Sequence, residues 1–219
     1  MAASIAHEIN QPLAGIVLNG NASLRWLAGD PPNLNEAREA TRRIVRDGQR
    51  AGNVITRLRS LFRREGTPAE RLGINEVIQE VMALTRADVQ KGGATIQTRM
   101  AAELPLVTGD RVQLQQLMLN LIMNAVEAMT AVHDRPREIV ITTSRGEGPE
   151  VLVRVQDSGM GLDPEGREKL FDAFYTSKSV GMGMGLAISR SIVEHHGGRL
   201  WTISNHGPGA TFLFTIPCP

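Results

Sequence analysis

The chain has 219 residues, of which 42% are hydrophobic, enough for a substantial core. Its 24 Lys and Arg residues nearly balance 23 Asp and Glu residues, so no overall charge attracts nucleic acid or an anionic membrane. The single cysteine, Cys218, excludes an internal disulfide and a zinc site built from cysteines, and it favours a reducing, cytoplasmic location.

Helical periodicity already runs at Ala2, so we expect this chain to be a fragment of a longer protein. No apolar run reaches the length that spans a bilayer. We therefore expect no membrane contact by this fragment, although the intact protein can be anchored in a membrane.

Two long helices are predicted first. Apolar residues with helical spacing form one stripe expected to be buried over 2–28, residues 29–32 stop the helix, and a heptad pattern predicts a second helix over 34–64. At 1.5 Å per residue the second helix would be roughly 45 Å long, too long for a small core to cover. We predict an antiparallel hairpin that forms a four-helix bundle in a homodimer; a monomeric hairpin docked on the second domain is the alternative.

The pattern changes after residues 63–68, which predicts two domains, 1–66 and 67–219. The second should be an α+β sandwich with helices on one face of a mixed sheet. Its helices are predicted at 75–91 with Asn75 as the cap, at 110–129 with a capping box of Asp110 and Gln113, and at 184–196. Its strands are predicted at 94–100, 138–144, 151–156, 199–204 and 211–216.

Polar residues on the predicted helix 110–129 are candidates for metal binding. Asn120, Asn124 and Glu127 recur at spacings of four and three, which places them on one helical face. The amide oxygen of Asn124 could ligate Mg²⁺, which keeps most of its waters and phosphate ligands. Capping of neighbouring loops explains the same asparagines equally well.

Asp157 ends a predicted strand and is followed by Gly159 and Gly161, which permit a tight turn and a close approach of the backbone. A carboxylate at this position can accept a hydrogen bond from an exocyclic amino group such as N6 of adenine. Ordinary turn chemistry is the alternative explanation of the same residues.

Three glycines, Gly181, Gly183 and Gly185, alternate immediately before the last predicted helix. The free amides and positive dipole end of such a helix favour phosphate. The segment lacks the Lys-Ser/Thr of a P-loop and the glycine spacing of a dinucleotide-binding fold, and a non-functional loop is the alternative.

His7 is the candidate nucleophile. It lies between Ile5 and Ile9 of the apolar stripe, and two residues rotate a helix by about 200°, so its imidazole is predicted to point away from the core. A neutral imidazole keeps one ring nitrogen free, and Glu8 can orient the proton on the other. Pro12 cannot donate to the carbonyl of Glu8, and we expect it to bend the helix one turn beyond His7.

Five segments, HEINQPL, LNLIMNAVEAM, DSGMGLD, FDAFYTSK and GMGMGLAIS, resemble the H, N, G1, F and G2 boxes of the sensor histidine kinases of two-component systems. They occur in that family's order and cover nearly the whole chain. The resemblance implies a HisKA-type dimerisation and phosphoacceptor hairpin over 1–66 and a GHKL, or Bergerat-type, ATP-binding domain over 67–219. It also implies ATP and Mg²⁺ as cofactors and the receiver domain of a response regulator as partner.

The resemblance implies roles for individual residues. His7 would be phosphorylated with Glu8 as its acid–base partner, Asn124 would ligate Mg²⁺ with Asn120 beside it, and Asp157 would bind adenine. The other positions that it implies for nucleotide binding are Gly159, Gly161, Lys178, Gly181, Gly183, Gly185 and Leu186.

The function implied is an ATP-dependent protein-histidine kinase that autophosphorylates His7 and passes the phosphoryl group to an aspartate of a response regulator. Gyrase, mismatch-repair and heat-shock members of the GHKL group carry a water-activating glutamate where this chain has Asn120, and an amide is not a general base. Phosphoryl transfer is therefore expected rather than rapid hydrolysis. The alternatives are a GHKL-type ATPase that drives conformational change without histidine phosphorylation, and a nucleotide-binding scaffold without chemistry.

Overall fold

The computed structural model describes residues 2–62, 70–162, 169–173, 175, 183–205 and 207–219, with only the backbone described at 2–10, 49–62 and 204. The chain divides into two compact units, Met1–Glu65 and Gly66–Pro219. The domain boundary at 66–67 stays a prediction, because residues 63–69 lie outside the described part.

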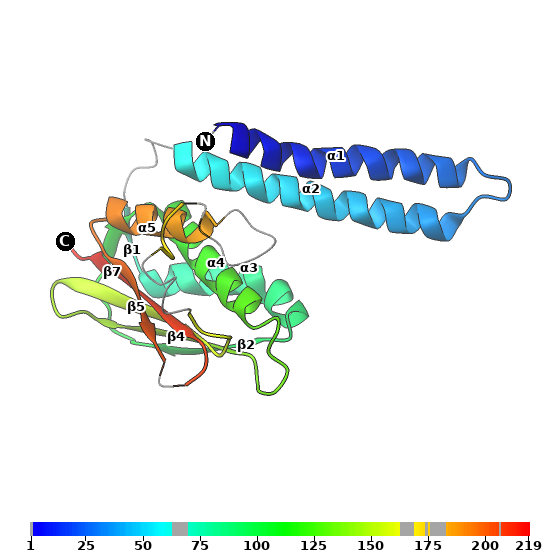
Figure 1. Cartoon of the computed structure of the whole chain (residues 1–219). Helices are drawn as coiled ribbons and strands as arrows, with labels where there is room; N and C mark the ends of the chain where they lie inside the picture. The colour runs from blue at the N-terminus through cyan, green and yellow to red at the C-terminus, as the bar shows by residue number, and fades with distance from the viewer. Residues whose placement is uncertain (1, 63–69, 163–168, 174, 176–182, 206) are drawn as a thin grey trace. The chain divides into compact units, whose positions relative to one another are not determined.

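The first unit is the predicted antiparallel hairpin of two helices, α1 (Ala2–Leu27) and α2 (Leu34–Phe62) (Figure 1). The helical conformation of α1 continues through Pro12. Asn33 caps the start of α2, because its Oδ1 accepts a hydrogen bond of 3.1 Å from the backbone N–H of Glu36. Between the helices, Nε of Arg43 donates to Oδ1 of Asn19 at 2.7 Å.

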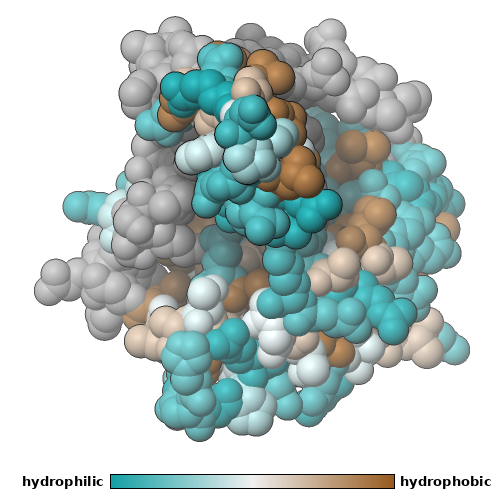
Figure 2. Space-filling view, turned by 90° about the vertical axis from the view of Figure 1, so that its right-hand side faces the viewer, coloured by the Kyte–Doolittle hydropathy of each residue, from teal (hydrophilic) through white to brown (hydrophobic). Residues whose placement is uncertain are grey.

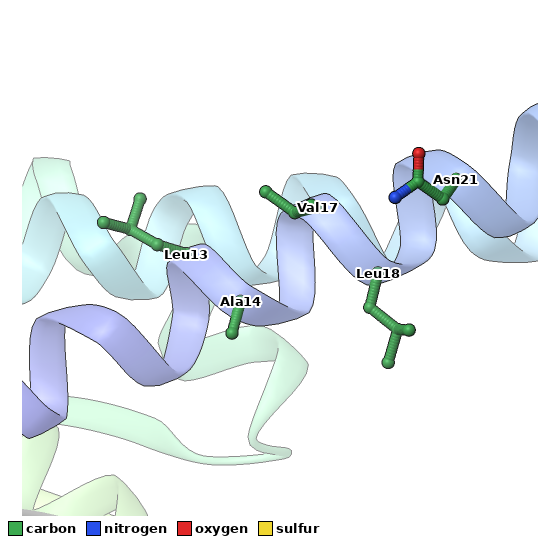
Figure 3. A pocket seen from close by; sticks show the side chains of 5 residues that line it. All are labelled: Leu13, Ala14, Val17, Leu18 and Asn21. Atoms are coloured by element: carbon green, nitrogen blue, oxygen red, sulfur yellow. The ribbon is translucent and has the colours of Figure 1, made fainter.

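The apolar stripe of α1 is partly exposed within one chain, so its burial by a second copy stays a prediction. Leu13, Leu24 and Leu27 are 45%, 66% and 46% exposed, because a single neighbouring helix covers only one side of α1. The hairpin end that faces the viewer in Figure 2 presents hydrophobic surface beside hydrophilic surface. Further along α1, an open pocket is lined by Leu13, Ala14, Val17, Leu18 and Asn21 (Figure 3).

The second unit contains a five-stranded mixed sheet in the order β2-β4-β5-β7-β6. β2 and β4 are parallel, and the other neighbouring pairs are antiparallel. The strands of this sheet are β2 (Thr95–Met100), β4 (Glu138–Arg145), β5 (Glu150–Asp157), β6 (Leu200–Ser204) and β7 (Ala210–Pro217). They confirm the predicted strands to within a residue or two at each end.

Three helices, α3 (Ile74–Lys91), α4 (Arg111–Ala128) and α5 (Gly185–His195), cover one face of this sheet (Figure 1). The core lies between the two layers and contains fully buried side chains such as Leu117, Ile141 and Phe214. The predicted α+β sandwich with helices on one face of a mixed sheet is therefore confirmed.

Two strands were not predicted. β1 (Glu70–Leu72) and β3 (Val107–Gly109) form a separate antiparallel pair. Each has three residues, too few to establish an alternating pattern in the sequence.

Asp110 caps α4 as predicted, and its Oδ1 accepts from the backbone N–H groups of Val112 and Gln113 at 2.9 and 3.2 Å. The other hydrogen bond of the predicted capping box, from the backbone N–H of Asp110 to the Gln113 side chain, does not form, so that part of the prediction is wrong. The backbone N–H of Asp110 donates to Nε2 of His196 at 3.0 Å, while the Gln113 amide donates to the Asp110 carboxylate. His196 follows the C-terminal end of α5, far from Asp110 in the sequence, so no local pattern predicts this hydrogen bond.

The prediction that Asn75 caps α3 is also wrong, because Gly73 occupies that position and Asn75 lies inside the helix. Its amide donates to the carbonyl of Ala101 at 2.8 Å and accepts from Oγ1 of Thr143 at 2.9 Å. Asn75 therefore joins α3 to the sheet.

Across the described part of the chain, no helix has both the length and the hydrophobicity that a bilayer span requires.

Candidate nucleotide site

Asp157 lies at the end of β5 and is 4% exposed. Its Oδ1 accepts from the backbone N–H of Gly159 at 2.8 Å and from that of Ala210 at 3.3 Å. Burial raises the pKa of the Asp157 carboxyl above its ordinary value, and these two hydrogen bonds oppose the rise. Among the described residues no hydrogen bond uses Oδ2, so this oxygen can accept from a ligand.

The loop between β6 and β7 closes around the Asp157 backbone. The amide of Asn205 donates to the carbonyl of Asp157 at 3.3 Å and accepts from the hydroxyl of Thr211 at 2.6 Å. Gly209 has φ +91°, and a Cβ there would lie 1.9 Å from the same carbonyl oxygen, so only glycine fits. Sequence analysis missed Asn205, Gly209, Ala210 and Thr211, which lie about fifty residues after Asp157 and contact it partly through backbone groups.

The turn after Asp157 is held against the end of α4. A Cβ at Gly159 would lie 2.8 Å from the carbonyl oxygen of Ala128, which confirms the predicted close approach. The N–H of Met160 donates to that oxygen at 3.3 Å. Gly161 has φ +84°, as expected for the predicted tight turn.

The polar face of α4 lies beside the start of α5. Asn120 is buried, and its amide donates to the carbonyl of Gly185 at 3.3 Å and to the hydroxyl of Ser189 at 3.5 Å. Its Oδ1 accepts from the amide of Gln116 at 2.9 Å. Asn120 is thus engaged by protein groups on both sides.

Asn124 lies one turn later and is half-buried. A Cβ at Gly185 would lie 3.9 Å from its Nδ2, so Asn124 is next to the first turn of α5. No hydrogen bond within the described residues uses the Asn124 amide. Its carbonyl oxygen can therefore serve a metal ion, and this donor type suits Mg²⁺.

The start of α5 has no side-chain cap among the described residues, and its N-cap is Met184. Gly183 has φ +64°, and Leu186 is half-buried in the first turn. The first amides of α5 have no acceptor among the described residues, which fits the predicted phosphate cradle. Lys178 and Gly181, also predicted here, lie outside the described residues.

One helix therefore joins both parts of the candidate site. The end of α4 contacts the turn after Asp157, and its middle contacts α5 (Figure 1). Three kinds of group therefore lie along α4. They are the Asp157 oxygen that can accept from a base, the Asn124 amide oxygen that can bind a metal, and the start of α5, which can bind phosphates. This set of groups fits a nucleotide.

His7 and Glu8 lie within α1, in the other unit. Only the backbone is described at these positions, so the predicted orientation of the His7 ring stays a prediction. The structure establishes that both residues are helical and precede Pro12 in the same helix.

Comparison with known proteins gives two family matches. Residues 1–67 match the His Kinase A (phospho-acceptor) domain, and residues 109–219 match the histidine kinase-, DNA gyrase B- and HSP90-like ATPase family. Two curated relatives are 40% identical, the sensor histidine kinase TmoS of Ectopseudomonas mendocina over 217 residues and the sensor protein FixL of Bradyrhizobium diazoefficiens over 218 residues. Each alignment covers 99% of this chain, but only 22% of TmoS and 43% of FixL.

Solved structures agree with these matches. The nucleotide-free catalytic domain of the histidine kinase ThkA is 34% identical with a TM-score of 0.61, over 69% of this chain and 96% of that one. The structure of ThkA in complex with the response regulator protein TrrA has a TM-score of 0.71 at 28% identity, over 100% of this chain and 61% of that one. The chain thus belongs to the sensor histidine kinase family, of which it is a catalytic core with a phospho-acceptor hairpin and an ATPase-type nucleotide domain.

Proposed function

We propose that this chain is an ATP-dependent protein-histidine kinase that phosphorylates its own His7 and passes the phosphoryl group to an aspartate of a response regulator. The observation that carries the proposal is the buried Asp157 carboxylate, whose Oδ2 accepts no hydrogen bond from the described residues. Such an oxygen accepts from the N6 amino group of adenine, whereas O6 of guanine would face it with lone pairs. The phospho-acceptor family match over 1–67 supports His7 as the acceptor.

The surroundings of Asn120 favour transfer over hydrolysis. A GHKL ATPase that splits ATP with water needs a general base, and an amide has no proton affinity for that role. The amide of Asn120 is also bonded to Gly185, Ser189 and Gln116. The hydrolytic alternative therefore finds no support at this position.

Asn124 is the residue that we propose to hold Mg²⁺, because its amide is free of the described hydrogen bonds and lies beside α5. Bound Mg²⁺ would neutralise charge on the phosphate oxygens. The first amides of α5 would act on the same oxygens as fixed donors. A ring nitrogen of His7 then bonds to the γ-phosphorus as the bond to the β–γ bridging oxygen breaks, and ADP leaves.

Dimerisation of the hairpin and docking of a response regulator complete the proposal. The exposed apolar side chains of α1 support a second copy as the partner that covers them. ThkA is solved with the response regulator protein TrrA, which supports a receiver domain as the phosphoryl acceptor here.

The test is incubation of the chain with γ-labelled ATP and Mg²⁺. We expect protein-bound label that is acid-labile and alkali-stable, as a phosphohistidine is, and its complete loss in His7→Gln. His133→Gln, an exposed histidine of the other unit, is the control that should keep the label. Steady phosphate release without protein-bound label would instead identify an ATPase and refute the kinase proposal.

A further inference from the structure

Arg135 lies in the loop between α4 and β4, outside the five motifs. Its Nε donates to the carbonyl of Ser158 at 3.0 Å, and a second guanidinium nitrogen donates to the carbonyl of Gly159 at 2.9 Å. The third nitrogen forms an ion pair with Asp134 at 3.1 Å. The guanidinium thus holds two consecutive carbonyls of the turn that follows Asp157.

The other groups of this turn are held as well. The N–H of Ser158 donates to the carbonyl of Glu138 at 3.1 Å, and the Ser158 hydroxyl donates to the carbonyl of Pro136 at 2.8 Å. The central N–H, that of Gly159, donates to Oδ1 of Asp157. This N–H makes the shorter of the two hydrogen bonds to Oδ1, the other being the 3.3 Å bond from the N–H of Ala210, and so helps to orient the carboxylate with Oδ2 left for a ligand.

We propose that Arg135 is a positioning residue that sets the base selectivity of the nucleotide site. By fixing the Ser158 and Gly159 carbonyls, it holds the Gly159 N–H on Oδ1 of Asp157 and leaves Oδ2 aimed at an exocyclic amino group. This inference rests on the proposed ATP-binding function and adds to it a residue that acts through the turn after Asp157.

The charge of Asp157 supports the same role. Burial raises the pKa of this carboxyl, and the hydrogen bond from Gly159 counteracts that effect. If the turn moves and this bond weakens, the pKa rises further, and the protonated acid is a poorer acceptor for an amino group. The guanidinium thereby also helps to keep the carboxylate ionised.

Arginine is required for this geometry, because its planar fork donates in two fixed directions at once. A lysine retains the charge and most of the alkyl chain but concentrates its donors at one point. Arg135→Lys should therefore not restore the selectivity that Arg135→Ala loses. This separates positioning from simple charge.

Arg137 offers a matched control from the same loop. Its guanidinium donates to the carbonyls of Val132 and Gly92 at 2.8 Å each, and to that of Thr130 at 3.3 Å. It therefore makes at least as many backbone contacts as Arg135, but none of these contacts is with residues 158–160. Arg137→Ala should destabilise the unit without changing base selectivity.

The experiment measures dissociation constants for ATP and GTP with Mg²⁺ on the full chain and its variants Arg135→Ala, Arg135→Lys and Arg137→Ala, together with autophosphorylation rates and thermal unfolding. We expect both Arg135 variants to lose about tenfold of the ATP-over-GTP preference, with KM for ATP raised and the saturated rate within about twofold. Arg137→Ala should keep the wild-type preference.

An unchanged preference in the Arg135 variants, or an equal loss in Arg137→Ala, would overturn the inference. If Arg135→Ala does not fold, Arg135→Lys carries the test alone. Failure of the proposed function itself shows in the unmodified chain, as absence of ATP binding or of ATP-over-GTP preference, and is thereby distinguished from failure of the Arg135 inference.

Discussion

The two units differ in where their apolar side chains lie. In the second unit, Gly66–Pro219, here called the nucleotide unit, a core of large apolar residues such as Leu117 and Phe214 is fully buried by other parts of the same chain, and single residues such as Leu84 and Met160 are exposed. In the described part of the hairpin, large apolar residues such as Val17, Leu18 and Leu24 are 63–66% exposed. The nucleotide unit can thus be stable alone, whereas the hairpin needs a partner to bury its surface.

The largest effect is expected from Leu117→Ala, in the core of the nucleotide unit. Leu117 is 0% exposed, and its truncation should lower the free energy of unfolding by about 2–5 kcal/mol through lost burial and a cavity. Chemical denaturation of the full chain, followed at several protein concentrations, measures this. Because the core belongs to one chain, the loss in free energy of unfolding should not depend on protein concentration. A loss that did would contradict the difference drawn between the two units.

The opposite behaviour is expected from Leu18→Lys on α1. If a second copy buries Leu18, replacement with a charge should weaken association at least tenfold, since burying a leucine contributes roughly 1.5–3 kcal/mol. Analytical ultracentrifugation over a range of concentrations measures the dimer. Arg38→Ala, an exposed polar position on α2, is the control, and an unchanged dimer in Leu18→Lys would show that α1 is covered by something else.

Asp157→Asn should weaken ATP binding by about ten- to a hundredfold, because a charge-assisted hydrogen bond is worth about 1.5–3 kcal/mol. The ATP-over-GTP preference should fall with it, while the dissociation constant of the dimer should not change. Calorimetric titration measures both nucleotides. Unchanged affinity for ATP and an unchanged preference would remove Asp157 from the site.

The raised pKa of Asp157 also gives this residue a pH signature. Between its ordinary value of 3.8 and its raised value in the folded protein, the folded state binds more protons than the unfolded state. Lowering the pH through this window should therefore favour the folded state through this group, while ATP affinity falls as the carboxylate is neutralised. In Asp157→Asn, the free energy of unfolding and the ATP affinity should both depend less on pH. If both kept the pH dependence of the wild type, Asp157 would not be the group that titrates.

The smallest effects compare one helix cap in each unit. Asp110 is buried and bonds two N–H groups of α4, whereas Asn33 bonds one N–H at the exposed start of α2. Alanine substitution of a cap costs about 0.5–2 kcal/mol, and we expect Asp110→Ala near the upper end and Asn33→Ala near the lower. Urea denaturation of both variants measures the difference, and equal costs would show that burial of the cap is unimportant here.

Much of the fold could be predicted because its signals are local. The Asp110 cap fixed the start of α4, and the strand ending in Asp157 was apparent from alternation and the glycines after it. The hairpin followed from apolar spacing and the stop at 29–32. Elements long enough to show a period, or bounded by a cap, were therefore found within a residue or two.

What was missed depends on contacts between distant parts of the chain. Asn205 binds the backbone carbonyl of Asp157, and Arg135 binds those of Ser158 and Gly159. Every residue has a backbone carbonyl, so the sequence gives no signal for such contacts. Asn75 resembles a cap in sequence, but its hydrogen bonds reach Ala101 and Thr143. The sequence correctly predicted an apolar face on α1, but the periodicity of one chain does not indicate which molecule covers that face.

The position of β7 has a consequence for synthesis of the protein. β7 is the last strand in chain order, yet it inserts between β5 and β6 and supplies the Ala210 N–H to Asp157. Until β7 leaves the ribosome, β5 lacks its neighbour on that side and the carboxylate lacks one of its two donors. A nascent or truncated chain that lacks β7 therefore has an incomplete candidate nucleotide site, even though the whole hairpin has already been made.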